Sequence, residues 1–140
     1  MGSGSIQLAR IFGIRIGASP SWFVVLFILI LALSSSYDDR YSDTTAYAVA
    51  VASAALFSLS LILHEMGHAI VARRHGIDIA GIDLWFFGGI AKLSRDSRSP
   101  SEEFKVAAAG PAVTLKIVIV CCAVGIATVG YHDFVDAVEL

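Results

Sequence analysis

Residues 63–69 read Leu-His-Glu-Met-Gly-His-Ala and lie inside a long apolar run. His64 and His68 are four residues apart, so in a helix they project from one face, one turn from each other, and both rings can reach a single metal ion. Glu65 lies beside them, where its carboxylate can take a proton from a water molecule at that ion. The pattern is typical of a zinc site with its own general base.

The composition indicates a membrane protein. The chain has 140 residues, which is enough for one domain. Only 16% of them are charged and 56% are hydrophobic, whereas a soluble domain carries about 25% charged residues. The net charge is −2 without a basic patch, which argues against a nucleic-acid partner. Cys121 and Cys122 are adjacent in an apolar run, which favours packed helix residues over a disulfide or a metal pair.

Three apolar stretches predict an all-α membrane protein with three transmembrane helices and short β-strands near the cytoplasmic face. The helices are expected at about residues 20–36, 44–74 and 102–130. Short strands are expected within residues 6–19 and 77–93, where Gly88-Gly89 marks a turn or a close approach of the backbone. Residues 1–5, Met-Gly-Ser-Gly-Ser, resemble an expression-tag remnant, which leaves residues 6–140 as a partial membrane-embedded core.

The distribution of basic residues predicts the orientation in the membrane. Arginines precede the first helix and follow the second, while the loop between these helices has three aspartates and one arginine. Cytoplasmic flanks carry the excess of Lys and Arg, so the N-terminus and residues 73–100 are expected in the cytoplasm of a multi-pass protein of the cell membrane. Because a helix rises 1.5 Å per residue, the His-Glu-x-x-His motif then lies about 8–13 Å from that surface.

A third metal ligand is not evident. A catalytic zinc normally has three protein ligands and one open position. His75 lies two turns past His68, and His132 is expected on the opposite side of the membrane. Glu102 and Glu103 are weak candidates, because acids in the first turn of a helix usually stabilise its N-terminus. Lys116 falls in the middle of the third helix, where a lysine costs about 2.5–3.5 kcal/mol.

Several motifs together resemble the site-2 protease family of intramembrane zinc metalloproteases. The resemblance covers residues 9–115, and it is carried by these segments in the family's order: Arg10-Ile11-Phe12-Gly13-Ile14-Arg15-Ile16, Ser19-Pro20-Ser21-Trp22, His64-Glu65-Met66-Gly67-His68-Ala69, Phe86-Phe87-Gly88-Gly89-Ile90-Ala91-Lys92-Leu93, Glu103-Phe104 and Ala108-Ala109-Gly110-Pro111. The first two resemble the prokaryotic branch, whose members often add regulatory domains.

The resemblance implies cleavage of transmembrane substrates within the bilayer. It implies that His64 and His68 bind Zn²⁺ and that Glu65 is the catalytic base. It also implies that Gly88 and Gly89 lie in a β-element that binds an unwound substrate as an added strand. Substrates of the family are often anti-sigma factors or membrane-bound transcription factors. The lipid bilayer is the other expected partner, and self-association is left open.

The sequence also departs from the family pattern. The family's third zinc ligand is an aspartate in a later helix, within an Asn-Pro…Asp-Gly motif that residues 1–140 do not contain. We therefore expect the N-terminal part of a protease core, without full activity alone. Thr114 stands where the family often has Asn or Ser, and Lys116 is unexpected. Two alternatives are a non-catalytic zinc-binding scaffold and a small channel or transporter, which would explain Lys116 and the buried histidines.

Overall fold

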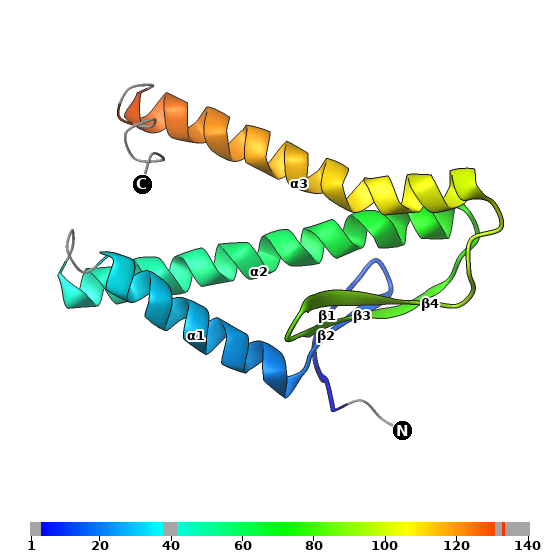
Figure 1. Cartoon of the computed structure of the whole chain (residues 1–140), viewed down its shortest axis with the longest axis horizontal. Helices are drawn as coiled ribbons and strands as arrows, with labels where there is room; N and C mark the ends of the chain where they lie inside the picture. Colours follow the sequence, from blue (N-terminus) through cyan, green and yellow to red (C-terminus); the bar gives the residue numbers. More distant parts are fainter. Residues whose placement is uncertain (1–3, 38–41, 131–132, 134–140) are drawn as a thin grey trace.

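A computed structural model describes residues 4–37, 42–130 and 133. Its helices are α1 (Pro20–Tyr37), α2 (Asp43–Arg74) and α3 (Pro100–Val129). All three are long and apolar enough to cross a membrane, which agrees with the three predicted helices to within two residues at each end. α2 lies between the other two, and the sheet lies beside its C-terminal end (Figure 1).

The strands form one four-stranded sheet, so the prediction of an all-α core with separate short strands was too narrow. The strands are β1 (Ile6–Ile11), β2 (Ile14–Ala18), β3 (Ile79–Trp85) and β4 (Gly88–Leu93), in the spatial order β1-β2-β3-β4. β1 and β4 each pair antiparallel with their neighbour, whereas β2 and β3 run parallel. This central parallel pair joins segments on either side of α1 and α2, a contact that local sequence patterns do not indicate.

The sheet packs on the C-terminal half of α2. Ile14, Ile16 and Ile82 form a buried cluster with Met66 and Ala69 of the helix. A second cluster joins the N-terminus of α1 to the sheet, and its buried members are Ala18, Trp22 and Leu84. These clusters fix the position of the His-Glu-x-x-His segment relative to the sheet.

α1 and α2 pack through small side chains. Ala46, Ala50 and Ala54 are buried at a spacing of four residues on α2, so the helices approach closely, as is common between membrane helices. Trp22 stacks on Phe57 with ring centroids 6.3 Å apart. The long uncharged part of α2 is thus held by α1, and its C-terminal part by the sheet.

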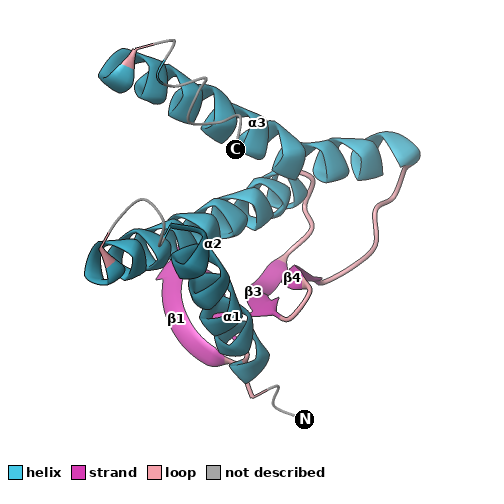
Figure 2. Cartoon of the chain, turned by 60° about the vertical axis from the view of Figure 1, so that its left-hand side comes forward, coloured by secondary structure: helices cyan, strands magenta, loops and turns pink. Residues whose placement is uncertain are grey.

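α3 meets α2 only near the sheet. Ser99 caps its N-terminus by accepting a hydrogen bond from the backbone N–H of Glu102. The buried residues of α3, Glu102 and Gly110, both lie in its first eleven positions. Beyond Pro111 the helix diverges from α2 (Figure 2). Lys116 is exposed in this diverging part.

The two hairpin turns differ in their residues and in their backbone conformation. Phe12 and Gly13 connect β1 to β2, and both have a positive φ, 50° and 78°. Phe86 and Phe87 form the turn between β3 and β4, so Gly88-Gly89 is not this turn but the start of β4. Of the two predicted roles, the close approach of the backbone is observed at Gly89, whereas Gly88 has a positive φ of 124° directly after the turn.

Candidate metal centre

The predicted site residues lie on the last third of α2, where α3 crosses the helix. His64, Glu65 and His68 are half-buried, and Gly67 between them is buried. A Cβ atom on Gly67 would lie 2.9 Å from the carbonyl oxygen of Ala109. Glycine at this position therefore allows the backbone of α3 to come close to both imidazole rings.

A backbone carbonyl orients His68. Its Nδ1 lies 2.7 Å from the carbonyl oxygen of Val106 on α3. A carbonyl oxygen only accepts hydrogen bonds, so Nδ1 carries the proton and donates it. In the neutral ring the lone pair is then on Nε2, which is the state that a metal ligand requires.

A threonine hydroxyl orients His64 in the same way. The Nδ1 of His64 lies 2.8 Å from the Oγ1 of Thr114. That hydroxyl donates its own proton to the carbonyl oxygen of Gly110, 3.4 Å away. Thr114 therefore accepts the Nδ1–H of His64, and the lone pair of this ring is again on Nε2.

The two Nε2 atoms face each other at a separation of 3.1 Å, with the ring planes 79° apart. At this distance one Nε2–H can donate to the other ring when no metal is bound. In the tautomer with both Nδ1 atoms protonated, the two Nε2 lone pairs converge, an arrangement that a cation would stabilise. Two imidazoles on a tetrahedral zinc, each at about 2.0–2.1 Å, have their nitrogens roughly 3.4 Å apart. The donor set and its spacing therefore fit Zn²⁺.

Gly110 makes this arrangement sterically feasible. A Cβ atom at this position would overlap Nε2 of His68 and would lie 2.7 Å from Nε2 of His64. Because Gly110 is buried in α3 between the two rings, any larger residue would displace them.

The carboxylate of Glu65 lies against β4. A Cβ atom on Gly89 would overlap Cγ of Glu65 and would lie 2.8 Å from its Cδ and 3.0 Å from Oε1. The glycine thus places the backbone of β4 in contact with the carboxylate. Gly89 therefore lies beside Glu65, and the binding of a substrate at Gly88 and Gly89 stays a prediction.

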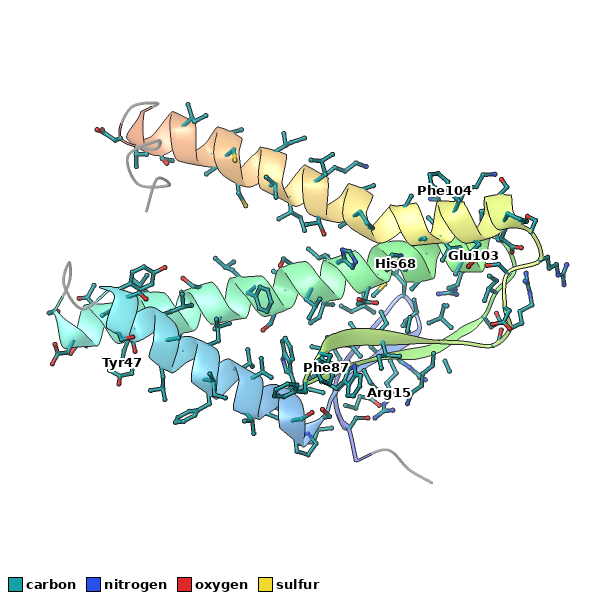
Figure 3. All side chains as sticks on the ribbon, viewed as in Figure 1. Arg15, Tyr47, His68, Phe87, Glu103 and Phe104 are labelled. Carbon is teal, nitrogen blue, oxygen red and sulfur yellow. The ribbon has the colours of Figure 1, made fainter. Side chains whose placement is uncertain are left out.

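The carboxylate and His64 line a pocket of about 280 Å³ between α2, α3 and the β3–β4 hairpin. Its other walls come from Phe57 and Leu61 of α2, from Thr114, and from the hairpin. Phe87, in the hairpin turn at the end of the sheet (Figure 3), is 80% exposed and lines this pocket together with residues of α2. An extended backbone at the free edge of β4 would be adjacent to Glu65.

The described residues supply two candidate metal ligands, His64 and His68. Across residues 4–37, 42–130 and 133 no third His, Cys, Asp or Glu joins the pair. Glu102 is engaged elsewhere: it pairs with Arg95 at 3.1 Å and accepts the backbone N–H of Arg98 at 2.7 Å. His75 is bonded to the carbonyl of Val71 in its own helix. Glu103 is exposed on α3 (Figure 3), and His132 lies outside the described residues.

Sequence reasoning missed Val106, Gly110 and Thr114 as parts of the site. All three lie on α3, 38 to 50 residues beyond the histidines that they contact. The run of small residues at 107–110 indicates a close helix contact, but it does not indicate which residues are in contact.

A pair of imidazole lone pairs with an adjacent carboxylate, on a helix able to span a membrane, defines a metallopeptidase-type centre. Comparison with protein families gives the same class. The model of peptidase family M50 matches residues 52–139, more than half of the chain. The chain therefore belongs to peptidase family M50, the site-2 protease family, and the resemblance noted in the sequence is confirmed.

Individual relatives agree with this family. The chain is 34% identical over 125 residues to sll0528 of Synechocystis, a protein named as a zinc metalloprotease, covering 88% of this chain and 33% of that protein. It is 31% identical to Rip3 of Mycobacterium tuberculosis, which has a similar name, over 81% of this chain and 30% of Rip3. The solved site-2 protease from Methanocaldococcus jannaschii superposes with a TM-score of 0.63 at 30% identity, covering 86% of this chain and 51% of that structure. The chain thus spans about a third of the length of its curated relatives.

Proposed function

We propose that this chain is the part of an intramembrane zinc metalloprotease that binds the metal and carries the catalytic base. The observation that carries the proposal is the convergence of the two Nε2 lone pairs beside the carboxylate of Glu65. His64 and His68 would hold Zn²⁺, which when bound acts as a Lewis acid on the peptide carbonyl and on water. We propose that the third protein ligand comes from a segment beyond the residues described.

Glu65 is the proposed general base. Its carboxylate is within reach of the pocket but is not engaged by a cationic side chain in the described contacts. In this role it takes a proton from the attacking water and delivers it to the leaving amine. Hydrolysis then needs no other acid or base from the described part of the chain.

The edge of β4 is the proposed substrate site. β4 is the last strand in the order β1-β2-β3-β4, so one side of its backbone has no neighbouring strand within the part of the chain that the structure describes. A helical substrate must first unwind, because its amides are already hydrogen-bonded. An unwound segment could pair with β4 at Gly88 and Gly89, which would place its backbone next to Glu65. Suitable substrates are transmembrane proteins, such as anti-sigma factors or membrane-bound transcription factors.

Replacement of Glu65 by Gln in the full-length protein tests the proposed chemistry. Glutamine keeps the shape but cannot take a proton, so cleavage of a transmembrane substrate in proteoliposomes should fall at least roughly 10²–10⁴-fold. Zinc content should stay unchanged, because the imidazoles are untouched. Undiminished cleavage would remove Glu65 from the mechanism and favour a different base.

Zinc stoichiometry of the purified 140-residue chain in detergent tests the metal site itself. About one zinc per chain, lost in His68→Ala, would mean that the two imidazoles recruit a further ligand from solvent, a local acid or a second chain. A chain that binds no zinc would mean that His64 and His68 need a further protein ligand that the 140 residues do not supply.

A further inference from the structure

The first hairpin exposes apolar side chains at the end of the molecule where the sheet lies. β1 is the outer strand of the sheet, and Ile6, Leu8 and Ile11 on it are 40–57% exposed. Phe12, in the turn that follows, is 76% exposed. These side chains belong neither to the buried core nor to the metal centre. An exposed apolar edge strand in water would favour aggregation, so a covering partner is expected.

The backbone of Phe12 is strained and held in place. Its φ of 50° lies in the left-handed region, which side chains other than those of Gly, Asn and Asp rarely adopt. Arg73 of α2 donates a hydrogen bond of 2.6 Å to its carbonyl oxygen. Asn or Gly would form this turn more easily, so the phenylalanine is better explained by what its exposed ring contacts.

An open groove connects this turn to α2. It has a volume of about 380 Å³ and is lined by Phe12, Ile70, Arg73 and Arg74. Phe12 and Ile70 form the apolar part of this lining, and the guanidinium groups of Arg73 and Arg74 form the charged part. The residues that line it include no Asp or Glu; Glu65 and Asp78 flank the segment 66–77, and Glu102 is paired with Arg95. The groove therefore combines apolar contact with two positive charges.

The position of Arg73 and Arg74 on α2 indicates at which depth in the membrane the groove lies. The apolar part of α2 ends at Ala72, and Arg73 and Arg74 follow. In a membrane helix such a transition lies at the level of the lipid headgroups. Because Arg73 binds the turn directly, the ring of Phe12 lies at the same level.

We propose that the β1–β2 turn is a membrane-surface anchor that binds an anionic phospholipid. Ile11, Phe12 and Ile70 contact the upper acyl chain, and Arg73 and Arg74 bind the phosphate through charge-assisted hydrogen bonds. This site is separate from the metal centre, and it concerns how the sheet is held against the bilayer.

A depth measurement on the reconstituted chain tests the anchor. In a background of Cys121→Ala and Cys122→Ala, Phe12→Cys carries an environment-sensitive fluorophore, and Asp96→Cys in the exposed 94–99 loop is the matched control. A third sample keeps Cys121 as a reporter of bilayer insertion. We expect a blue-shifted emission and several-fold stronger quenching by lipid-attached nitroxides at position 12 than at position 96.

Equal, water-like behaviour at positions 12 and 96 would overturn the proposal, as would a lack of quenching at Cys121. Quenching at position 12 that is independent of the nitroxide lipid but increases with the protein-to-lipid ratio would assign this surface to a second copy of the chain. That result would also overturn the proposal.

The charge requirement is tested by lipid preference. Quenching by phosphatidylglycerol nitroxides should exceed that by phosphatidylcholine nitroxides in the parent. One basic residue near a membrane surface changes this preference by about fivefold, so Arg74→Gln should reduce it by that factor. Arg98→Gln removes the same charge from the 94–99 loop and should leave the preference unchanged. Equal effects of both substitutions would contradict a specific headgroup site.

Discussion

At the scale of single residues, α3 rather than α2 determines how the two histidines present their nitrogens. The carbonyl of Val106 and the hydroxyl of Thr114 each take the Nδ1–H of one ring. The proposed metal ligands are therefore oriented by hydrogen bonds to a different helix. Such supporting contacts normally contribute substantially to metal affinity.

Thr114 offers a direct test of this support. Thr114→Val keeps the shape of the side chain but removes the acceptor, so His64 loses the partner that fixes its tautomer. Zinc affinity, measured by competition with a chromophoric chelator, should fall about 10–100-fold. Thr114→Ser retains the hydroxyl and should bind zinc like the parent. Equal affinity in the valine and serine variants would show that the contact does not matter for the metal.

The sequence predicts the metal-binding pair more completely than the environment of that pair. His64, Glu65 and His68 follow from a helical spacing alone, because i and i+4 share a face. Gly110 cannot be assigned this way, since its role depends on the crossing of α3 over α2, and the crossing depends on packing. Lys116 remains exposed on α3, and no contact among the described residues explains it.

At the scale of elements, the β3–β4 hairpin brings a backbone strand against the proposed base. Gly89→Ala would push Cβ into Cγ of Glu65. Since displacement of a catalytic group by about 1 Å can cost 100-fold in rate, cleavage by the full-length protein should fall by about this factor while zinc stays bound. Ile90→Ala, one residue further and on the opposite face of β4, is the control. Normal cleavage by Gly89→Ala would mean that Glu65 acts from another position.

The sheet also predicts a dependence of stability on pH. Lys92 pairs with Asp83 at 2.6 Å across β3 and β4. Partial burial raises the pKa of Asp83, but the hydrogen bond and charge of Lys92, together with Ser5 and Arg15, hold it below its ordinary value on balance. A lowered pKa stabilises the fold at pH values above the unfolded pKa of about 3.9. This contribution disappears as pH falls through the folded pKa.

Thermal unfolding in detergent checks this sign. The parent should lose more stability than Asp83→Asn as the pH decreases from near neutral to below about 4. At neutral pH the parent should be the more stable protein. Parallel pH profiles for the two proteins would show that the ion pair does not stabilise the sheet.

Element positions follow from the sequence, but their assembly does not. Apolar length locates the helices, and alternation with glycine punctuation locates the strands. Ile16 pairs with Ile82 in the parallel register of β2 and β3. This pairing requires that the antiparallel helices α1 and α2 bring β3 back beside β2, and that arrangement depends on tertiary packing, which local sequence patterns do not indicate. The contact of Ser5 with the sheet could not be predicted either. Residues 1–5 resemble a tag remnant, yet Ser5 accepts two hydrogen bonds from Arg15.

At the scale of the whole molecule, the charge distribution predicts one orientation in the membrane. Arg73 and Arg74 lie in the last turn of α2, and Lys92, Arg95 and Arg98 follow it. The end of α2 that carries the sheet is therefore expected in the cytoplasm. Ser97→Cys should resist a membrane-impermeant maleimide in intact cells and react after permeabilisation. Ser42→Cys, at the other end of α2, should react in intact cells. The reverse pattern would invert the orientation.

The attachment of α3 has a mechanical consequence. The helix is about 45 Å long, since each of its residues adds 1.5 Å. It is buried only near one end, and that end supplies Val106, Gly110 and Thr114 to the two imidazoles. The same short contact therefore both attaches α3 to α2 and orients the two rings. A shift of α3 relative to α2 at this contact would change the positions of both imidazoles together.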